Sequence, residues 1–192
     1  MRKIKVLLIF VLMFTSALVY GQDSWLRISG VPICSKTTDF KQGIEAQNWE
    51  VCPAEITNEI KPELALLIKD ELVNKAKFEC YSGTFVGKPA IMSIISYKNV
   101  IAYVGITILD TYDINSFNEL CNLYISKYGD IVNSQDGDGL KYVQWVTEYE
   151  FVELTYTEES LPYNLTIGYG NSEMRLAMFK SDDEAEGYYQ EI

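Results

Sequence analysis

Two β-rich runs, 90–97 and 100–108, give the clearest pattern along the chain, and only Lys98 and Asn99 separate them. A two-residue connection between two such runs predicts a β-hairpin. Both runs are almost continuously apolar, whereas strands with one solvated face alternate between apolar and polar residues. The two strands are therefore expected at the centre of a sheet, with at least one face covered by helices.

A helix is predicted over 116–128, where apolar side chains recur at spacings of three and four residues. Its apolar face consists of Phe117, Leu120, Cys121, Tyr124 and Tyr128. Ser116 and Glu119 have the spacing of a capping box, in which two side chains satisfy free backbone N–H groups at the start of a helix. Gly129 follows the last apolar residue and is expected to end the helix.

Two further helices are expected before the hairpin. An apolar stripe at helical spacing predicts a helix that opens at 61–63, with Pro62 in its first turn, and runs through Leu72. A looser pattern favours a short helix over 35–49, although Gly43 in its middle weakens the helical tendency.

The remaining segments favour strands and turns. An extended segment at 25–29 runs into a turn at 30–32, and the polar segment 133–139 is predicted as a loop. After this loop, strands are expected at 140–146, 149–156, 165–169 and 174–179. The order of elements predicts an α+β fold in which two or three helices pack on one face of a curved antiparallel sheet.

Residues 1–21 have the order of a cleavable signal peptide. Arg2, Lys3 and Lys5 precede an apolar run, and small residues follow it. The apolar stretch 6–20 has 15 residues, whereas a helix that spans a membrane needs about 20. We therefore expect an exported protein, periplasmic or secreted, with no membrane span after cleavage. The mature chain then divides into one domain, 22–180, and an acidic tail, 181–192, that is expected to fray.

The chain is acidic, with a net charge of −11. Removal of the signal peptide leaves 13 Lys and Arg against 27 Asp and Glu, a net charge of about −14. A surface of this sign repels nucleic acid and favours solubility or a basic partner. We expect a monomer or a weakly associating protein with no nucleic-acid partner.

Cys34, Cys52, Cys80 and Cys121 allow three pairings. An even number of cysteines in an exported protein favours two disulfides, and the pairs Cys34–Cys52 and Cys80–Cys121 are preferred because the first closes a short loop and the second joins a strand to a helix. Free buried thiols are the equally weighted alternative. No metal or other cofactor is expected, because the chain has no histidine and no closely spaced cysteine pair.

The absence of histidine excludes catalysis that uses imidazole as a base. Paired carboxylates remain, and Glu148, Glu150 and Glu153 are the candidates, of which Glu148 and Glu150 project from the same face of a strand. The favoured alternative is a solvated face of an edge strand, where like charges also oppose aggregation.

The segment 136–139 resembles a calcium-binding loop only in part. The twelfth residue of a loop that begins at Asp136 is Thr147, where an EF-hand has Glu. The favoured interpretation is a polar turn between two elements.

Aromatic side chains near the C-terminal strands form another candidate site. Tyr142, Trp145, Tyr149 and Tyr163 are candidates for a platform that stacks sugars or binds a protein partner. Packing in the hydrophobic core is the favoured role for most of them.

Three segments resemble short exported proteins of unknown function of the Bacteroidota type. These segments are 28–33, with the sequence ISGVPI, 83–87, with the sequence GTFVG, and 124–129, with the sequence YISKYG. The resemblance implies a compact α+β domain located in the cell envelope, and it implies no functional residues.

The sequence thus favours an exported binding domain, more consistent with a non-enzyme than with an enzyme, whose partner is a protein or an envelope glycan. Two alternatives stay open. One is a glycan hydrolase that uses paired carboxylates, and the other is an acidic inhibitor of a basic secreted hydrolase.

Overall fold

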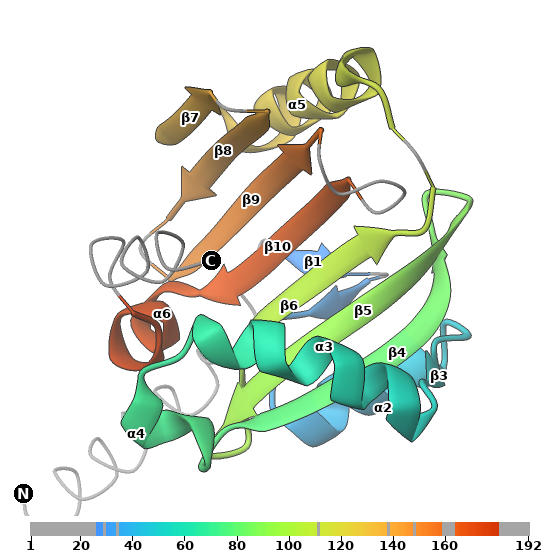
Figure 1. The fold of residues 1–192 in the computed structure, drawn as a ribbon, viewed down its shortest axis with the longest axis vertical. Helices are drawn as coiled ribbons and strands as arrows, with labels where there is room; N and C mark the ends of the chain where they lie inside the picture. The colour runs from blue at the N-terminus through green and yellow to red at the C-terminus, as the bar shows by residue number, and fades with distance from the viewer. Residues whose placement is uncertain are drawn as a thin grey trace, which may run out of the picture.

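The structure is a computed structural model that describes residues 26–28, 30–33, 35–110, 112–137, 139–147, 149–158 and 164–180 (Figure 1). The expected signal peptide, 1–21, and the acidic tail, 181–192, lie outside these residues. Cys34, Glu148 and Tyr163 also lie outside them.

An antiparallel sheet of eight strands forms the centre of the fold, in the order β3-β4-β5-β6-β10-β9-β8-β7. The strands are β3 (Glu50–Val51), β4 (Lys77–Phe85), β5 (Lys88–Tyr97), β6 (Val100–Ile108), β7 (Asn133–Gly137), β8 (Leu140–Val146), β9 (Glu150–Thr157) and β10 (Leu165–Asn171). Two four-strand meanders, β3 to β6 and β7 to β10, meet where β6 pairs with β10. The predicted α+β class and its antiparallel sheet are confirmed.

Helices cover both faces of this sheet (Figure 1). The helices are α2 (Thr37–Glu45), α3 (Ala54–Leu66), α4 (Asp70–Val73), α5 (Ile114–Tyr128) and α6 (Ser172–Met178). The first face packs against α2, α5 and a two-stranded ribbon of β1 (Arg27–Ile28) and β2 (Val31–Pro32). The second face packs against α3, α4 and α6 around Ile68, Tyr103 and Phe151. The prediction placed helices on one face of the sheet, and the structure has a second helical layer on the other face as well.

The central hairpin forms as predicted. β5 and β6 are joined by Lys98 and Asn99, whose φ angles are 50° and 64°. Two consecutive residues with positive φ are what a tight two-residue hairpin turn needs. The hairpin is largely buried, because the two helical layers leave little of its surface open to solvent.

The helix α5 ends at Gly129 as predicted, with φ at 87°, but it begins earlier than predicted. The Asp113 carboxylate caps its first turn by accepting a hydrogen bond from the Ser116 backbone N–H at 2.8 Å. The capping box predicted at Ser116 is therefore wrong, and Ser116 lies inside the helix. The predicted start near Pro62 is also wrong, because α3 begins at Ala54 and contains Pro62.

Two segments near the C-terminal half differ in type from their prediction. The segment predicted as a strand over 174–179 is mostly the helix α6, which begins where the Asn171 side chain accepts a hydrogen bond from the Met174 backbone N–H at 3.0 Å. The segment predicted as a loop over 133–139 contains β7, an edge strand that is exposed along its whole length. Local capping outweighs the alternating apolar pattern at 174–179, and pairing with β8 makes a strand of the polar segment 133–137.

Candidate functional site

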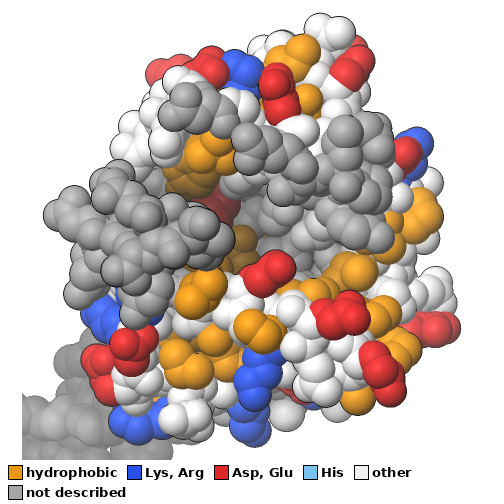
Figure 2. All heavy atoms as spheres, viewed as in Figure 1, with side chains coloured by type: hydrophobic (Ala, Val, Ile, Leu, Met, Phe, Trp, Pro, Cys, Tyr) orange, Lys and Arg blue, Asp and Glu red, His pale blue; other side chains and the backbone are white. Residues whose placement is uncertain are grey.

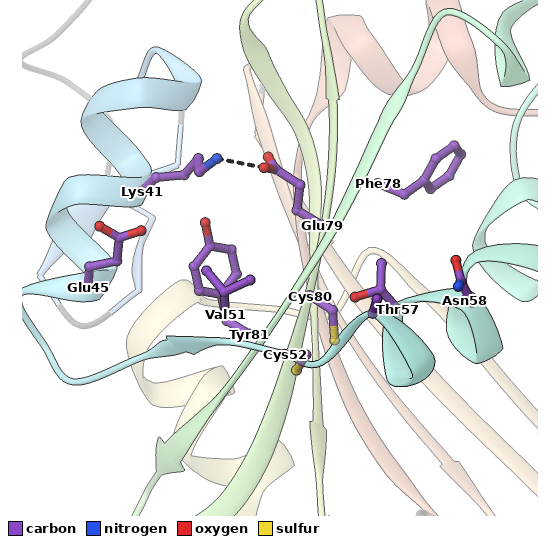
Figure 3. Close-up of a pocket in the computed structure, with 11 residues that line it drawn as sticks. Lys41, Glu45, Val51, Cys52, Thr57, Asn58, Phe78, Glu79, Cys80 and Tyr81 are labelled. Carbon is purple, nitrogen blue, oxygen red and sulfur yellow. Dashed lines mark hydrogen bonds and ion pairs between the residues drawn. The ribbon is translucent and has the colours of Figure 1, made fainter.

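A pocket of about 450 Å3 opens where β3 ends at the edge of the sheet (Figure 3). β3 has only two residues, which pair with Ser82 and Tyr81 of β4. The chain then leaves the sheet and begins α3 at Ala54, so the outer edge of β4 is left open beside this helix. The pocket lies between α2, β4 and the first turns of α3.

A glycine on β4 allows a tryptophan to pack closely against the strand next to this pocket. A Cβ atom at Gly83 would lie 2.6 Å from the indole ring of Trp49, so only glycine lets the ring pack so closely on the strand. Trp49 is 2 % exposed and directly precedes β3. Its packing therefore holds β3 and the pocket wall against β4.

An ion pair crosses the pocket. The Lys41 ammonium group on α2 donates a hydrogen bond to Oε1 of Glu79 on β4 at 2.6 Å (Figure 3). This hydrogen bond raises the pKa of Lys41. The other oxygen of the same carboxylate, Oε2, is buried and has no hydrogen-bond partner within the described part of the chain. A buried acceptor in that state costs about 1–3 kcal/mol.

The Tyr81 phenol lies beside this ion pair and also lines the pocket. Burial raises the pKa of Tyr81, while the nearby Lys41 charge opposes the increase. The phenol is therefore neutral at physiological pH and offers a hydrogen-bonding group at the pocket wall.

Two cysteines form another part of the wall. The Cys52 backbone N–H donates a hydrogen bond to the Cys80 carbonyl oxygen at 2.9 Å, which continues the pairing of β3 with β4 by one residue. Both side chains are buried, and their sulfur atoms lie on the same side of β4 (Figure 3). Burial, with the adjacent Cys52 thiol as a further cause, raises the pKa of Cys80 to about 12.

The preferred disulfides are not formed. Among the described cysteines, Cys52, Cys80 and Cys121 are all free thiols. The predicted pair Cys80–Cys121 is wrong. Cys80 lies on β4, whereas Cys121 lies on α5, which packs against β9. β9 is four strand positions from β4 in the sheet, a distance of about 19 Å. The pair Cys34–Cys52 includes a residue outside the described chain, and Cys52 faces Cys80.

A second carboxylate cluster lies on the second face of the sheet around Glu153. The Tyr142 hydroxyl donates a hydrogen bond to Glu153 Oε2 at 3.1 Å, and Arg175 Nη1 on α6 lies 3.9 Å from the same oxygen. Burial raises the pKa of Glu153, although Arg175 and the Tyr142 and Tyr103 hydroxyls oppose the increase. Burial and the Glu153 charge also raise the pKa of Tyr103 and of Tyr142.

A glycine makes room for this cluster. A Cβ atom at Gly168 would lie 2.5 Å from Glu153 Oε1 and 2.6 Å from the Tyr103 hydroxyl oxygen. The cluster therefore fills the space over β10, and the Glu153 carboxylate has the two tyrosine hydroxyls and Arg175 as partners, whereas Gln144 Nε2 beside it has no hydrogen-bond partner within the described residues. This arrangement is that of a structural network in the second layer.

Of the carboxylates expected for a hydrolase, Glu150 and Glu153 point to opposite faces of the sheet. Glu148 lies outside the described residues, and Glu150 is 1 % exposed on the first face, where its Oε2 accepts a hydrogen bond from the Leu26 backbone N–H at 3.2 Å. Glu153 projects from the opposite face, because it is an odd number of residues away along the same strand. The expectation that Glu150 lies on a solvated face is wrong as well, since its carboxylate helps to hold the N-terminal ribbon.

The candidate aromatic residues do not form one platform. Trp145 is 1 % exposed, packs against Tyr124 and Tyr128, and donates a hydrogen bond from Nε1 to the Gly129 carbonyl oxygen at 3.0 Å. Tyr142 points to the opposite face toward Glu153. Tyr149 is 59 % exposed, and Tyr163 lies outside the described residues.

Trp145 is therefore a core residue. Its neighbour in the candidate set, Tyr142, belongs to the polar network on the other face. Tyr142 and Trp145 are three residues apart, and an odd spacing along a strand puts two side chains on opposite faces.

Within the described residues, no group of three or more Cys, Asp or Glu side chains is arranged to hold a metal ion. The same part of the chain contains no helix with the length and apolar character needed to cross a membrane. The partial calcium-loop segment is instead tied to β8 by an ion pair between Asp136 and Lys141.

Comparison with known proteins gives no relative: no family model matches the chain, and no curated protein or solved structure matches it significantly. The class defined by the fold is an open α+β sandwich of one eight-stranded sheet between two helical layers. Within the described residues, the pocket beside β3 combines a cavity, an ion pair and a buried acceptor without a partner.

Proposed function

We propose that the chain is an exported, non-enzymatic binding domain that acts on a protein partner in the periplasm or outside the cell. In this proposal the pocket beside β3 receives a basic side chain of the partner. The observation that carries it is the Glu79 carboxylate, which has one oxygen paired with Lys41 and the other buried without a partner among the described residues.

A lysine or arginine side chain matches this carboxylate. Glu79 Oε2 is buried, so the atoms that cover it must move before a ligand N–H reaches it. A hydrogen bond formed there recovers the cost of the unsatisfied acceptor, and hydrogen bonds to charged groups contribute about 1.5–3 kcal/mol. Glu45 also lines the pocket, so its two carboxylates outnumber the single Lys41 ammonium group. The excess negative charge favours a cationic group over an anionic one.

Acidic side chains also lie on the surface beside the pocket, together with the Lys61 ammonium group, which lies over the ring of the lining residue Phe78. Glu55 and Glu59 are exposed on α3, whose first turns line the pocket, and acidic side chains lie along this helix between apolar ones (Figure 2). The whole chain has a net charge of −11. A potential of this kind increases the association rate of a basic partner.

A protein is favoured over an envelope glycan as the partner. Sugar-binding sites commonly present aromatic faces to the ligand, whereas Trp145 is buried in the core and Tyr142 belongs to the network around Glu153. A basic secreted hydrolase is one partner that fits this proposal, and in that case the chain would be its inhibitor.

The proposal is tested with immobilised protein, residues 22–192, and with lysine-rich and arginine-rich peptides as probes. The lysine-rich peptide with acetylated side chains and a panel of peptidoglycan and polysaccharides serve as comparison ligands. We expect saturable binding of a basic peptide and a loss of affinity of about tenfold or more in Glu79→Gln. Binding should also weaken with increasing salt.

Glu119→Gln is the matched control, because Glu119 is exposed on α5 and the substitution removes the same charge. It should retain the affinity of the wild-type protein. An equal loss in the two variants would mean that only net charge matters. Glycan binding that is unchanged in Glu79→Gln would contradict both the partner class and the site.

A further inference from the structure

The two thiols in the pocket wall lie opposite each other on neighbouring strands. β3 and β4 pair Glu50 with Ser82 and Val51 with Tyr81, so the next position of the same register pairs Cys52 with Cys80. The hydrogen bond from the Cys52 backbone N–H to the Cys80 carbonyl oxygen confirms that this register continues.

This placement meets the distance requirement of a disulfide. Residues directly opposite each other in an antiparallel pair have Cα atoms about 4.5–5.5 Å apart and side chains on the same face. Cysteines joined by a disulfide have Cα atoms about 4.4–6.8 Å apart. In Figure 3 the two sulfur atoms lie near each other on one side of β4.

We propose that Cys52 and Cys80 are a dithiol site that closes to an intramolecular disulfide, with a small-molecule or protein disulfide as the oxidant. The bond joins the end of β3 to β4 across the wall of the pocket. Cys121 has no part in it, because it lies on α5.

The oxidation proceeds in two exchange steps. The Cys52 thiolate attacks one sulfur of the oxidant, which forms a mixed disulfide and releases the other half of the oxidant as a thiolate. The Cys80 thiol gives its proton to that thiolate and attacks the Cys52 sulfur, which releases the second half of the oxidant. Two thiols lose two electrons and two protons, and one disulfide is reduced to two thiols.

Burial determines the rate of these steps. Burial raises the pKa of the Cys80 thiol, so little Cys80 thiolate is present at neutral pH, and the exchange balances in the same way whichever of the two thiols attacks first. The two side chains are 5 % and 3 % exposed, so the oxidant must approach through the pocket. Oxidation is accordingly expected to be slow without a catalyst and to be selective for this pair.

The bond would constrain a defined part of the molecule. The chain between Cys52 and Cys80 contains α3 and α4, which form much of the second helical layer. Closing this loop restricts the unfolded chain and holds the first turn of α3 beside β4. The inference concerns the chemistry of the two thiols and holds whichever ligand the pocket binds.

The experiment compares the full-length protein before and after incubation with oxidised glutathione, with unreacted thiols blocked and the digested peptides analysed by mass spectrometry. We expect a peptide that links Cys52 to Cys80 and contains two hydrogen atoms fewer than the separate peptides. We also expect an increase in Tm on the order of 10 °C that dithiothreitol reverses. The variant Cys121→Ser should show the same bond and the same increase.

Cys52→Ser should show neither the bond nor the increase in Tm. If that variant does not fold, peptide mapping of the wild-type protein decides the question by itself. Glutathione attached to Cys52 or Cys80 with no internal bond would overturn the inference. A bond from either residue to Cys34 or Cys121 would overturn it too.

Discussion

The carboxylates of Glu79 and Glu153 are both partly buried and both lie near a basic side chain, but they differ in their other hydrogen-bond partners. Each lies on a strand and faces a basic side chain from a helix, Lys41 on α2 at 2.6 Å and Arg175 on α6 at 3.9 Å. The hydroxyl groups of two tyrosines complete the surroundings of Glu153, whereas Glu79 Oε2 has no partner among the described residues.

The difference separates a structural role from a binding role. A carboxylate whose neighbours satisfy it contributes to the packing of the molecule, and its removal leaves several polar groups without a partner. Glu79 lines a pocket and has one oxygen without a partner, but this oxygen is buried, so a ligand group reaches it only when the atoms that cover it move. Removal of Glu153 should therefore affect stability most, and removal of Glu79 should affect binding most.

The largest effect is expected for Glu153→Ala. This substitution leaves the Tyr103 and Tyr142 hydroxyls without their acceptor and opens a cavity over β10, so the free energy of unfolding should decrease by about 2–4 kcal/mol. Urea denaturation measures it. Glu79→Ala should cost clearly less, and an equal or larger loss in Glu79→Ala would remove the distinction between the two carboxylates.

The next effect is expected for Gly168→Ala. The new methyl group would lie 2.5 Å from Glu153 Oε1 and 2.6 Å from the Tyr103 hydroxyl oxygen, so both side chains must move. We expect a decrease in the free energy of unfolding of about 1–3 kcal/mol in thermal or urea denaturation.

Gly137→Ala is the matched control, because a Cβ atom at Gly137 on the exposed strand β7 meets no atom within 4 Å. Its stability should stay within about 0.5 kcal/mol of the wild-type value. If Gly168→Ala were equally harmless, the Glu153 network would be looser than its distances indicate.

The pH dependence of stability gives a third effect. Since burial raises the folded-state pKa of Glu153 above its unfolded value, the folded state binds more protons in the interval between these two values. Stability should therefore decrease as the pH rises through this interval, by up to about 1.4 kcal/mol per pH unit for this one group. Glu153→Gln should lack this contribution.

Urea denaturation of the wild-type protein and Glu153→Gln between acidic and neutral pH measures the difference. Asp113 contributes with the opposite sign, because hydrogen bonds from Ser116 lower its pKa, and the contribution is common to both proteins. A difference that increases with pH in favour of the wild-type protein would contradict the assigned direction.

The smallest effect on stability is expected for Glu79→Gln. The ion pair with Lys41 is about one third exposed, with side-chain exposures of 28 % and 32 %, and such pairs contribute about 0–1 kcal/mol. The amide also retains an oxygen that can accept from Lys41. A loss above about 2 kcal/mol in urea denaturation would show that Glu79 is structural and would weaken the binding proposal.

The helices and strands of this fold could be predicted from the sequence more accurately than its candidate site. The two-residue turn at Lys98 and Asn99 and the end of α5 at Gly129 could be predicted because each depends on a few adjacent residues. The helix α6 was missed because Met174 and Met178 fit an alternating pattern as well as a helical one, although Asn171 is a typical capping residue.

The site depends on contacts that local patterns do not encode. β3 has two residues and therefore no periodicity, and it is β3 that places Cys52 opposite Cys80. Glu79 meets Lys41 only because α2 packs against β4, 38 residues away along the chain. Phe151 and Val152 are both apolar, so the alternation along β9 does not show to which face Glu153 points.

The central claim is that a basic group binds beside Glu79, and an NMR titration of the isotopically labelled protein with the lysine-rich peptide tests it most directly. The account predicts saturable shifts of the Lys41, Cys52 and Glu79 backbone amides at lower peptide concentrations than any shift near Arg175 and Tyr142, and their loss in Glu79→Gln. Shifts that begin around Arg175 and Tyr142, or that persist unchanged in Glu79→Gln, would contradict it.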